Sequence, residues 1–194
     1  MKTPEQLLDG ICRRWRRKGY GVHSPFAYDF ITYVARRTVS DARFEAAVSD
    51  QNLFKEEMEM GRLLFRVVDH VRPALIVDGG DLLWAGICMR AASPNADYRC
   101  VTDKEPIPVD RPIGLIHLSL TAIPRNAADV WRACSGGLMD DVVVVMSGLH
   151  TTRYSDEFWE QFGNSFSMPV TTFDFGKVGV VFFDKQKQSQ HYKV

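Results

Sequence analysis

The sequence lacks an excess of charge of either sign, paired cysteines and long apolar runs, and each absence excludes a class of protein. Lysine plus arginine equals aspartate plus glutamate at 24 each, so no overall field attracts nucleic acid or an anionic membrane. The cysteines form no CxxC pair, and no histidine stands near them at zinc-ligand spacing, so we expect reduced thiols and no metal site. The four are Cys12, Cys88, Cys100 and Cys134.

Targeting and membrane signals are also lacking. The opening stretch, MKTPEQLLDG, has no apolar signal-peptide core, and no later run approaches the ~18 apolar residues that cross a bilayer. Five basic residues lie within residues 13–18, interleaved with aromatic Trp15 and followed by Tyr20. They fit a solvated helix end, with local contact to nucleic acid as the minor alternative. We therefore predict a cytoplasmic protein that binds neither nucleic acid nor membrane.

The chain has no internal repeat, low-complexity tract or Pro/Gly/Ser-rich linker. Its 194 residues, 45% of them hydrophobic, predict a single domain over 1–194. Residues 1–72 have helical periodicity and predict an N-terminal helical cap and first helix, while 73–194 form the core. Ser24 followed by Pro25 is typical of a helix start. A further helix is expected from about residue 50 to 70.

Short apolar runs bounded by turn residues fill the rest of the chain. Runs without strict alternation indicate strands covered on both faces, as in parallel sheets, and helical segments fit between several of them. The sequence therefore predicts an α/β fold with a doubly wound, mostly parallel sheet. The last two runs are joined by Gly176 and Lys177 alone, which predicts a C-terminal antiparallel hairpin. The runs are 75–77, 98–102, 113–120, 142–146, 171–175 and 178–183.

The first strand-to-helix turn, VDGGDLLWAG at 77–86, is the first candidate site. Ligands of open α/β sheets bind at the carboxyl ends of the strands, where Gly79 and Gly80 let the backbone approach a ligand closely. A Gly-Gly pair after a strand is equally typical of a plain tight turn. The negative charge of Asp81 would repel a pyrophosphate at this turn, which favours a nucleoside ligand that carries no phosphate.

Beyond the second strand, Asp103 is the candidate acceptor for ribose hydroxyls. It lies about 25 residues past the glycine turn, near the ~20 expected of such an acid, although a solvated turn residue fits equally. His150, just beyond the VVVVM strand, and His23, before the Ser24 helix start, are candidate catalytic groups; loop or turn roles are the alternatives. His117 lies within an apolar strand and is interpreted as a hydrogen-bonded core residue.

The two ends of the chain resemble a known family. RRKGYGVHSPFAYDFIT at 16–32 and TTFDFGKVGVVFFDKQKQSQHYKV at 171–194 are similar to the N-terminal GxHSPF signature and final hairpin of bacterial class I S-adenosylmethionine-dependent methyltransferase-like proteins. The resemblance implies a Rossmann-like methyltransferase sheet with an N-terminal helical extension. It also implies S-adenosylmethionine as cofactor, held by Asp78, Gly79, Gly80 and Asp103.

The sequence departs from that family at several points. Asp78 and Gly80 match the family's cofactor loop, but Trp84 replaces its last glycine and Gly86 comes two residues late. A tryptophan ring pointing into the mouth of the sheet would occupy the cofactor's space. Only about nine residues separate Asp103 from the next strand, so the third strand of the family is expected to be missing. Ser147 and Gly148 replace acidic residues, which removes the family's metal site.

Two functions remain open at this point. The first is a methyltransferase with a remodelled pocket that transfers methyl to a hydroxyl of a small molecule, with His150 or His23 as general base. The second is a catalytically inactive descendant that acts as a binding or interaction module. An NAD-dependent oxidoreductase is disfavoured by Asp81, by the lack of GxGxxG and by the hairpin. The apolar final hairpin is a candidate homodimer surface.

Overall fold

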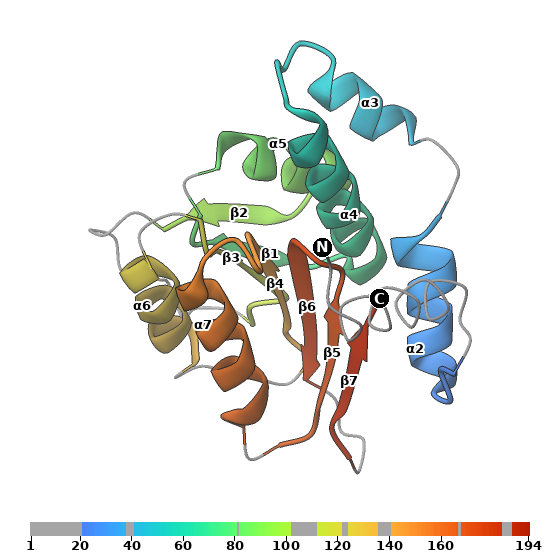
Figure 1. Cartoon of the computed structure of the whole chain (residues 1–194). Coiled ribbons are helices and arrows are strands. Elements are labelled where there is room, and N and C mark those ends of the chain that lie inside the picture. The colour runs from blue at the N-terminus through green and yellow to red at the C-terminus, as the bar shows by residue number, and fades with distance from the viewer. Residues whose placement is uncertain are drawn as a thin grey trace, which may run out of the picture.

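A seven-stranded sheet in the order β2-β1-β3-β4-β6-β5-β7 organises the chain (Figure 1). The computed structural model describes residues 21–37, 41–80, 82–101, 112–121, 124–135, 141–166, 168–183 and 188–194. Neighbouring strands pair in parallel, except that β6 runs antiparallel to both β4 and β5. The strands are β1 Leu75–Asp78, β2 Asp97–Cys100, β3 Leu115–Ser119, β4 Val143–Ser147, β5 Val170–Asp174, β6 Val178–Phe183 and β7 Gln190–Lys193.

The predicted α/β architecture is confirmed. All six apolar runs are strands β1 to β6, the sheet is mostly parallel, and β5 and β6 form the antiparallel hairpin. The hairpin lies inside the sheet, because β7 pairs with β5 and forms the edge. This last strand was not predicted; its sequence, QHYK, is polar and its burial alternates as expected for an edge strand.

The prediction of a missing third strand concerns residues 102–111, which lie outside the described residues. Asp103 and Asp81 lie outside them as well. Within the part of the chain that is described, β2 is the edge strand next to β1.

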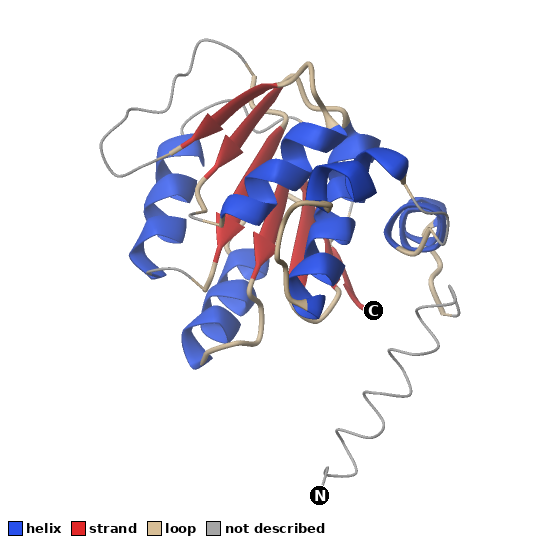
Figure 2. Cartoon of the chain, turned by 90° about the horizontal axis from the view of Figure 1, so that it is seen from above, coloured by secondary structure: helices blue, strands red, loops and turns tan. Residues whose placement is uncertain are grey.

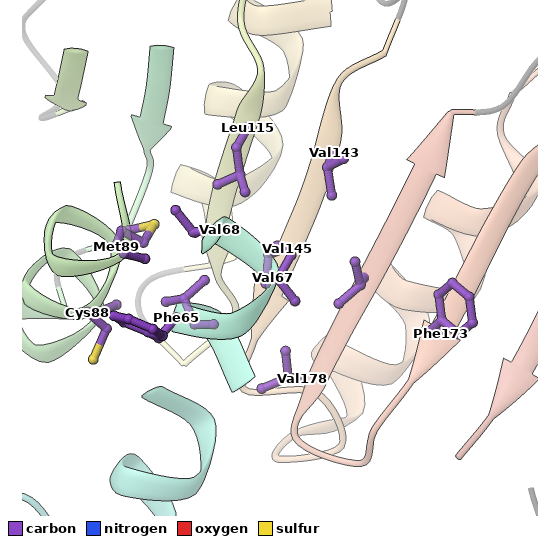
Figure 3. Close-up of a cluster of buried hydrophobic side chains, with 14 of the residues drawn as sticks. Phe65, Val67, Val68, Cys88, Met89, Leu115, Val143, Val145, Phe173 and Val178 are labelled. Carbon is purple, nitrogen blue, oxygen red and sulfur yellow. The ribbon is translucent and has the colours of Figure 1, made fainter. Parts of the chain in front are cut away.

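Helices cover both faces of the sheet (Figure 2). One face packs against α4, Lys55–Val71, and α5, Leu83–Ala92, and Figure 3 shows this core, with Phe65 and Val67 of α4 beside strand residues such as Val145. The other face packs against α6, Pro124–Ser135, and α7, Arg153–Asn164. The strands alternate between these two clusters, which explains their uninterrupted apolar runs.

The N-terminal part of the structure begins at the predicted helix start. Ser24 caps α2, Pro25–Asp29, by accepting a hydrogen bond from the Ala27 amide at 3.3 Å. The helix continues as a π-helix, η1, Phe30–Ala35. The helix predicted from residue 50 begins later, at Lys55, and is preceded by an unpredicted short helix α3, Ala42–Val48. The helix predicted before residue 20 lies outside the described residues. Among those described, no helix combines the length and apolarity needed to cross a membrane.

Candidate functional site

Three buried polar side chains form a line at the carboxyl ends of β1, β3 and β4. Asp78 Oδ1 lies 2.8 Å from His117 Nδ1, and His117 Nε2 lies 3.1 Å from Ser147 Oγ. Asp78 pairs with His117 in register, so their side chains point to the same face of the sheet. In the neutral tautomer with its proton on Nδ1, His117 donates to Asp78 and accepts from the Ser147 hydroxyl.

The glycine turn closes over this line and uses its own amides internally. Gly79 N–H donates to the His117 carbonyl at 2.8 Å, and Gly80 N–H donates to Asp78 Oδ1 at 2.9 Å. A Cβ added at Gly80 would lie 3.1 Å from both Asp78 Oδ1 and His117 Cε1. Glycine is therefore needed at Gly80 for close packing onto the protein's own side chains.

Tyr98 of β2 fills the remaining side of Asp78. Its phenol donates a hydrogen bond to Asp78 Oδ2. A Cβ at Gly86 would lie 2.5 Å from the Tyr98 oxygen, so this glycine leaves room for the phenol to pass α5. Burial and the Asp78 carboxylate raise the pKa of Tyr98, which stays a donor. Gly86, which comes two residues later than the last glycine of the family's cofactor loop, thus leaves room for the Tyr98 phenol.

The Asp78 carboxylate is ionised despite its burial. Desolvation alone would raise its pKa, but the interaction with His117 and the hydrogen bonds from His117, Tyr98 and Gly80 hold the pKa below the ordinary value. Each of its oxygens accepts at least one hydrogen bond from the protein. Among the residues predicted to hold a cofactor, Gly80 thus bonds Asp78, and Gly79 bonds the His117 carbonyl instead.

Asp78, His117 and Ser147 have the connectivity of a serine hydrolase triad, but burial argues against that chemistry. A nucleophile must reach its substrate, whereas Ser147 is 2% exposed and His117 0% exposed. The interpretation of His117 as a hydrogen-bonded core residue is therefore confirmed. We assign the line a structural role, which joins three strands.

Trp84 lies in the helical layer. It is buried on α5 within the cluster that α3 and α4 share, and a Cβ at Gly61 of α4 would lie 3.5 Å from its ring. Its ring packs toward α4, so the expectation that Trp84 fills the cofactor's space at the mouth of the sheet is wrong.

The candidate general bases stand apart from the glycine turn. His23 is exposed beside the cap residue Ser24. His150, with a positive φ of 57°, is held between two carboxylates: Nδ1 bonds Asp156, and Nε2 lies 3.1 Å from Asp174 Oδ2. Burial works against its charge, but the two hydrogen bonds and the two negative charges raise the pKa of His150 above the ordinary 6.5. The two carboxylates thus position the imidazole of His150 and favour its protonated form.

This histidine also lines a cavity of about 230 Å³ between α7 and the β5–β7 edge, together with Trp159 and His191. No group of three or more His, Cys, Asp or Glu side chains in the described residues is placed to hold a metal ion.

Protonation of His150 predicts a pH-dependent stability. A histidine whose folded pKa is raised stabilises the fold fully below its unfolded pKa, near 6.5, and this stabilisation is lost as pH rises through the folded value. We expect the difference in unfolding free energy between wild type and His150→Asn to be largest near about pH 5.5 and to shrink by about pH 9. Urea titrations across this range measure it, and asparagine tolerates the positive φ.

His191→Asn is the matched control. The His191 ring lines the same cavity but bonds the Thr172 hydroxyl at 2.8 Å rather than two carboxylates, so this variant removes a histidine without removing the pairing that His150 makes. A His150→Asn effect that grows with pH would contradict the assignment.

Comparisons with known proteins add little to this geometry. No protein family model matches the sequence, and no curated protein matches it either. A crystal structure of a methyltransferase from Geobacter sulfurreducens overlaps with a TM-score of 0.47 at 15% identity, covering 76% of this chain and 91% of that chain. That overlap is too weak to argue from. The strand order and the antiparallel hairpin, with helices on both faces of the sheet, define a Rossmann-like α/β fold.

Proposed function

We propose that this chain is a methyltransferase-fold protein that does not transfer methyl groups and serves as a binding module. One observation carries the proposal: Tyr98, His117 and the Gly80 amide use both oxygens of Asp78. A cofactor at this edge needs free donors on the turn and room for close approach of the backbone. The amides of Gly79 and Gly80 are already bonded within the protein, and Gly80 packs closely onto Asp78 and His117, which speaks against S-adenosylmethionine at these two residues.

Methyl transfer requires little from a protein beyond binding and alignment of the reacting groups. Loss of the binding site is therefore enough to end the activity, whatever base is nearby.

The proposal predicts that the melting temperature does not change with S-adenosylmethionine, S-adenosylhomocysteine or adenosine at millimolar concentration. A ligand present at 100 times its Kd would stabilise the folded state by about 2.7 kcal/mol, which differential scanning fluorimetry resolves easily. A methyltransferase of known cofactor affinity, run in the same buffer, is the positive control.

A clear upward shift with S-adenosylmethionine and S-adenosylhomocysteine would overturn the proposal. It would favour an active enzyme, with His23 as the more accessible base.

A further inference from the structure

Arginines line two adjoining cavities between η1 and α4, away from the glycine turn. The larger cavity measures about 510 Å³ and the smaller about 300 Å³. Arg37, which follows η1, and Arg66 of α4 line both cavities. Arg36 and Arg62 complete the lining of the larger cavity, whose one carboxylate is Glu59.

The local structure explains why these side chains converge. Arg62 and Arg66 lie four residues apart on α4 and therefore share one helix face. The η1 segment packs against the same helix, and Arg66 Nη1 donates to the carbonyl of Ala35 at 3.0 Å. This bond holds the end of η1, and with it Arg37, beside Arg66.

Arg66 is an incompletely compensated charge. It is half-buried, and within the described residues it hydrogen-bonds only the neutral Ala35 carbonyl. Burial, Arg62 and Arg37 all lower its pKa, although guanidinium stays charged. Burying a charge without an opposite partner is unfavourable, so a bound anion would stabilise this arrangement.

Arg37 supplies a second open donor. One of its terminal nitrogens bonds Asp41 at 2.8 Å and the other lies 3.9 Å from Asp69, which lines the smaller cavity. Its Nε, however, is buried and has no hydrogen-bond partner among the described residues. Arg62 likewise uses one nitrogen on Glu45 at 2.9 Å. Arg37 and Arg62 thus keep donors for a ligand while their other ends are positioned by carboxylates, and Arg66 is positioned by the Ala35 carbonyl.

We propose that this arginine cavity binds a small phosphorylated molecule through Arg37, Arg62 and Arg66. A phosphate group carries a charge of about −1.5 to −2 and three acceptor oxygens, which suits several guanidinium groups better than a single carboxylate does. The larger cavity has the size of small-molecule sites, roughly 300–1,000 Å³, and Leu63 and Phe175 give it an apolar wall. A concave site on a chain of zero net charge favours a small ligand over nucleic acid.

The cavity lies at the same edge of the sheet as the glycine turn. Phe175 follows the last residue of β5, which is parallel to β4, so it stands at the carboxyl end of the strands. The inference deepens the proposed binding function by naming a ligand class, and it requires no property of Asp78 or its neighbours.

Isothermal titration calorimetry with pyrophosphate and with inorganic phosphate, at constant ionic strength, tests the proposal. Wild-type protein should bind pyrophosphate, and Arg66→Gln should weaken binding about tenfold or more, the effect of losing a hydrogen bond to a charged group. Arg153→Gln is the matched control, because Arg153 is 92% exposed on α7 and should bind as wild type does. Arg37→Gln is a second variant, and circular dichroism confirms that each is folded.

Three outcomes would overturn the inference: no binding of pyrophosphate by wild type, equal losses in Arg66→Gln and Arg153→Gln, or a single-stranded RNA bound more tightly than pyrophosphate and insensitive to Arg66→Gln. Neither probe contains an adenosyl or sulfonium group. A lack of pyrophosphate binding would therefore not change the conclusion about S-adenosylmethionine. A melting-temperature shift with S-adenosylmethionine would likewise not change the conclusion about pyrophosphate.

Discussion

Replacement of His117 by alanine should lower the free energy of unfolding by about 3–5 kcal/mol, because it removes a hydrogen bond to a buried carboxylate and leaves a cavity in the core. Asp78 is 2% exposed and cannot recover the lost interaction from water. In a domain of this size each kcal/mol shifts the melting temperature by about 2–4 °C, so we expect a fall of roughly 6–20 °C. Thermal and urea unfolding of the two proteins measure the effect.

Two further variants make this test specific. Ser147→Ala removes only a hydrogen bond to His117 and should cost about 1 kcal/mol. Asp78→Asn combined with His117→Ala should cost less than the sum of the single changes, since both act on one network. A His117→Ala protein within about 1 kcal/mol of wild type would contradict the structural role, as would labelling of Ser147 by a fluorophosphonate.

The sequence predicted most of the sheet because burial on both faces leaves a plain signal. Strands β3 and β4 are apolar at three and four of their five positions, since alternate residues enter two different cores. Strand β7 gave no such signal: QHYK is mostly polar, and it is a strand because its backbone pairs with β5. Helix α3 was missed for a similar reason, since only Phe44 and Val48 of its residues are buried.

The candidate site was predicted only in part. The position of the glycine turn could be predicted from the strand that precedes it. The hydrogen bond from Tyr98 to Asp78 beside the turn could not. Tyr98 reaches Asp78 because β2 lies beside β1 in a particular register and because Gly86 leaves room for the phenol, and neither fact is visible in the spacing of residues. The orientation of Trp84 likewise depends on how α5 packs against α4.

The arginine cavity could not be found from a motif. Its lining comes from η1, α4 and the end of β5, which are far apart in the sequence, and only the spacing of Arg62 and Arg66 is local. Arginine is common on exposed helix faces, so this spacing alone indicates solvent exposure. Arg66 differs from such exposed arginines because it bonds the Ala35 carbonyl of η1. This contact depends on how the N-terminal segment packs against the rest of the protein.

That docking depends on Phe30, the first residue of η1. Its ring is 1% exposed and lies 4.7 Å from the ring of Phe173 and 4.9 Å from that of Phe182, between centroids. We expect Phe30→Ala to lower the unfolding free energy by about 3–5 kcal/mol, as for other buried aromatic residues. Because η1 carries Ala35 and Arg37 to α4, the same change should also weaken pyrophosphate binding.

The controls separate anchoring from general damage. Phe30→Leu keeps most of the apolar contact and should cost less than about 1.5 kcal/mol, with binding retained. Tyr33→Ala, at a residue 67% exposed on the same segment, should affect stability little. If Phe30→Ala destabilises the protein but binds pyrophosphate as wild type does at a temperature where both are folded, the aromatic anchor does not position Arg37. The cavity would then be held by the Arg66 bond to Ala35 alone.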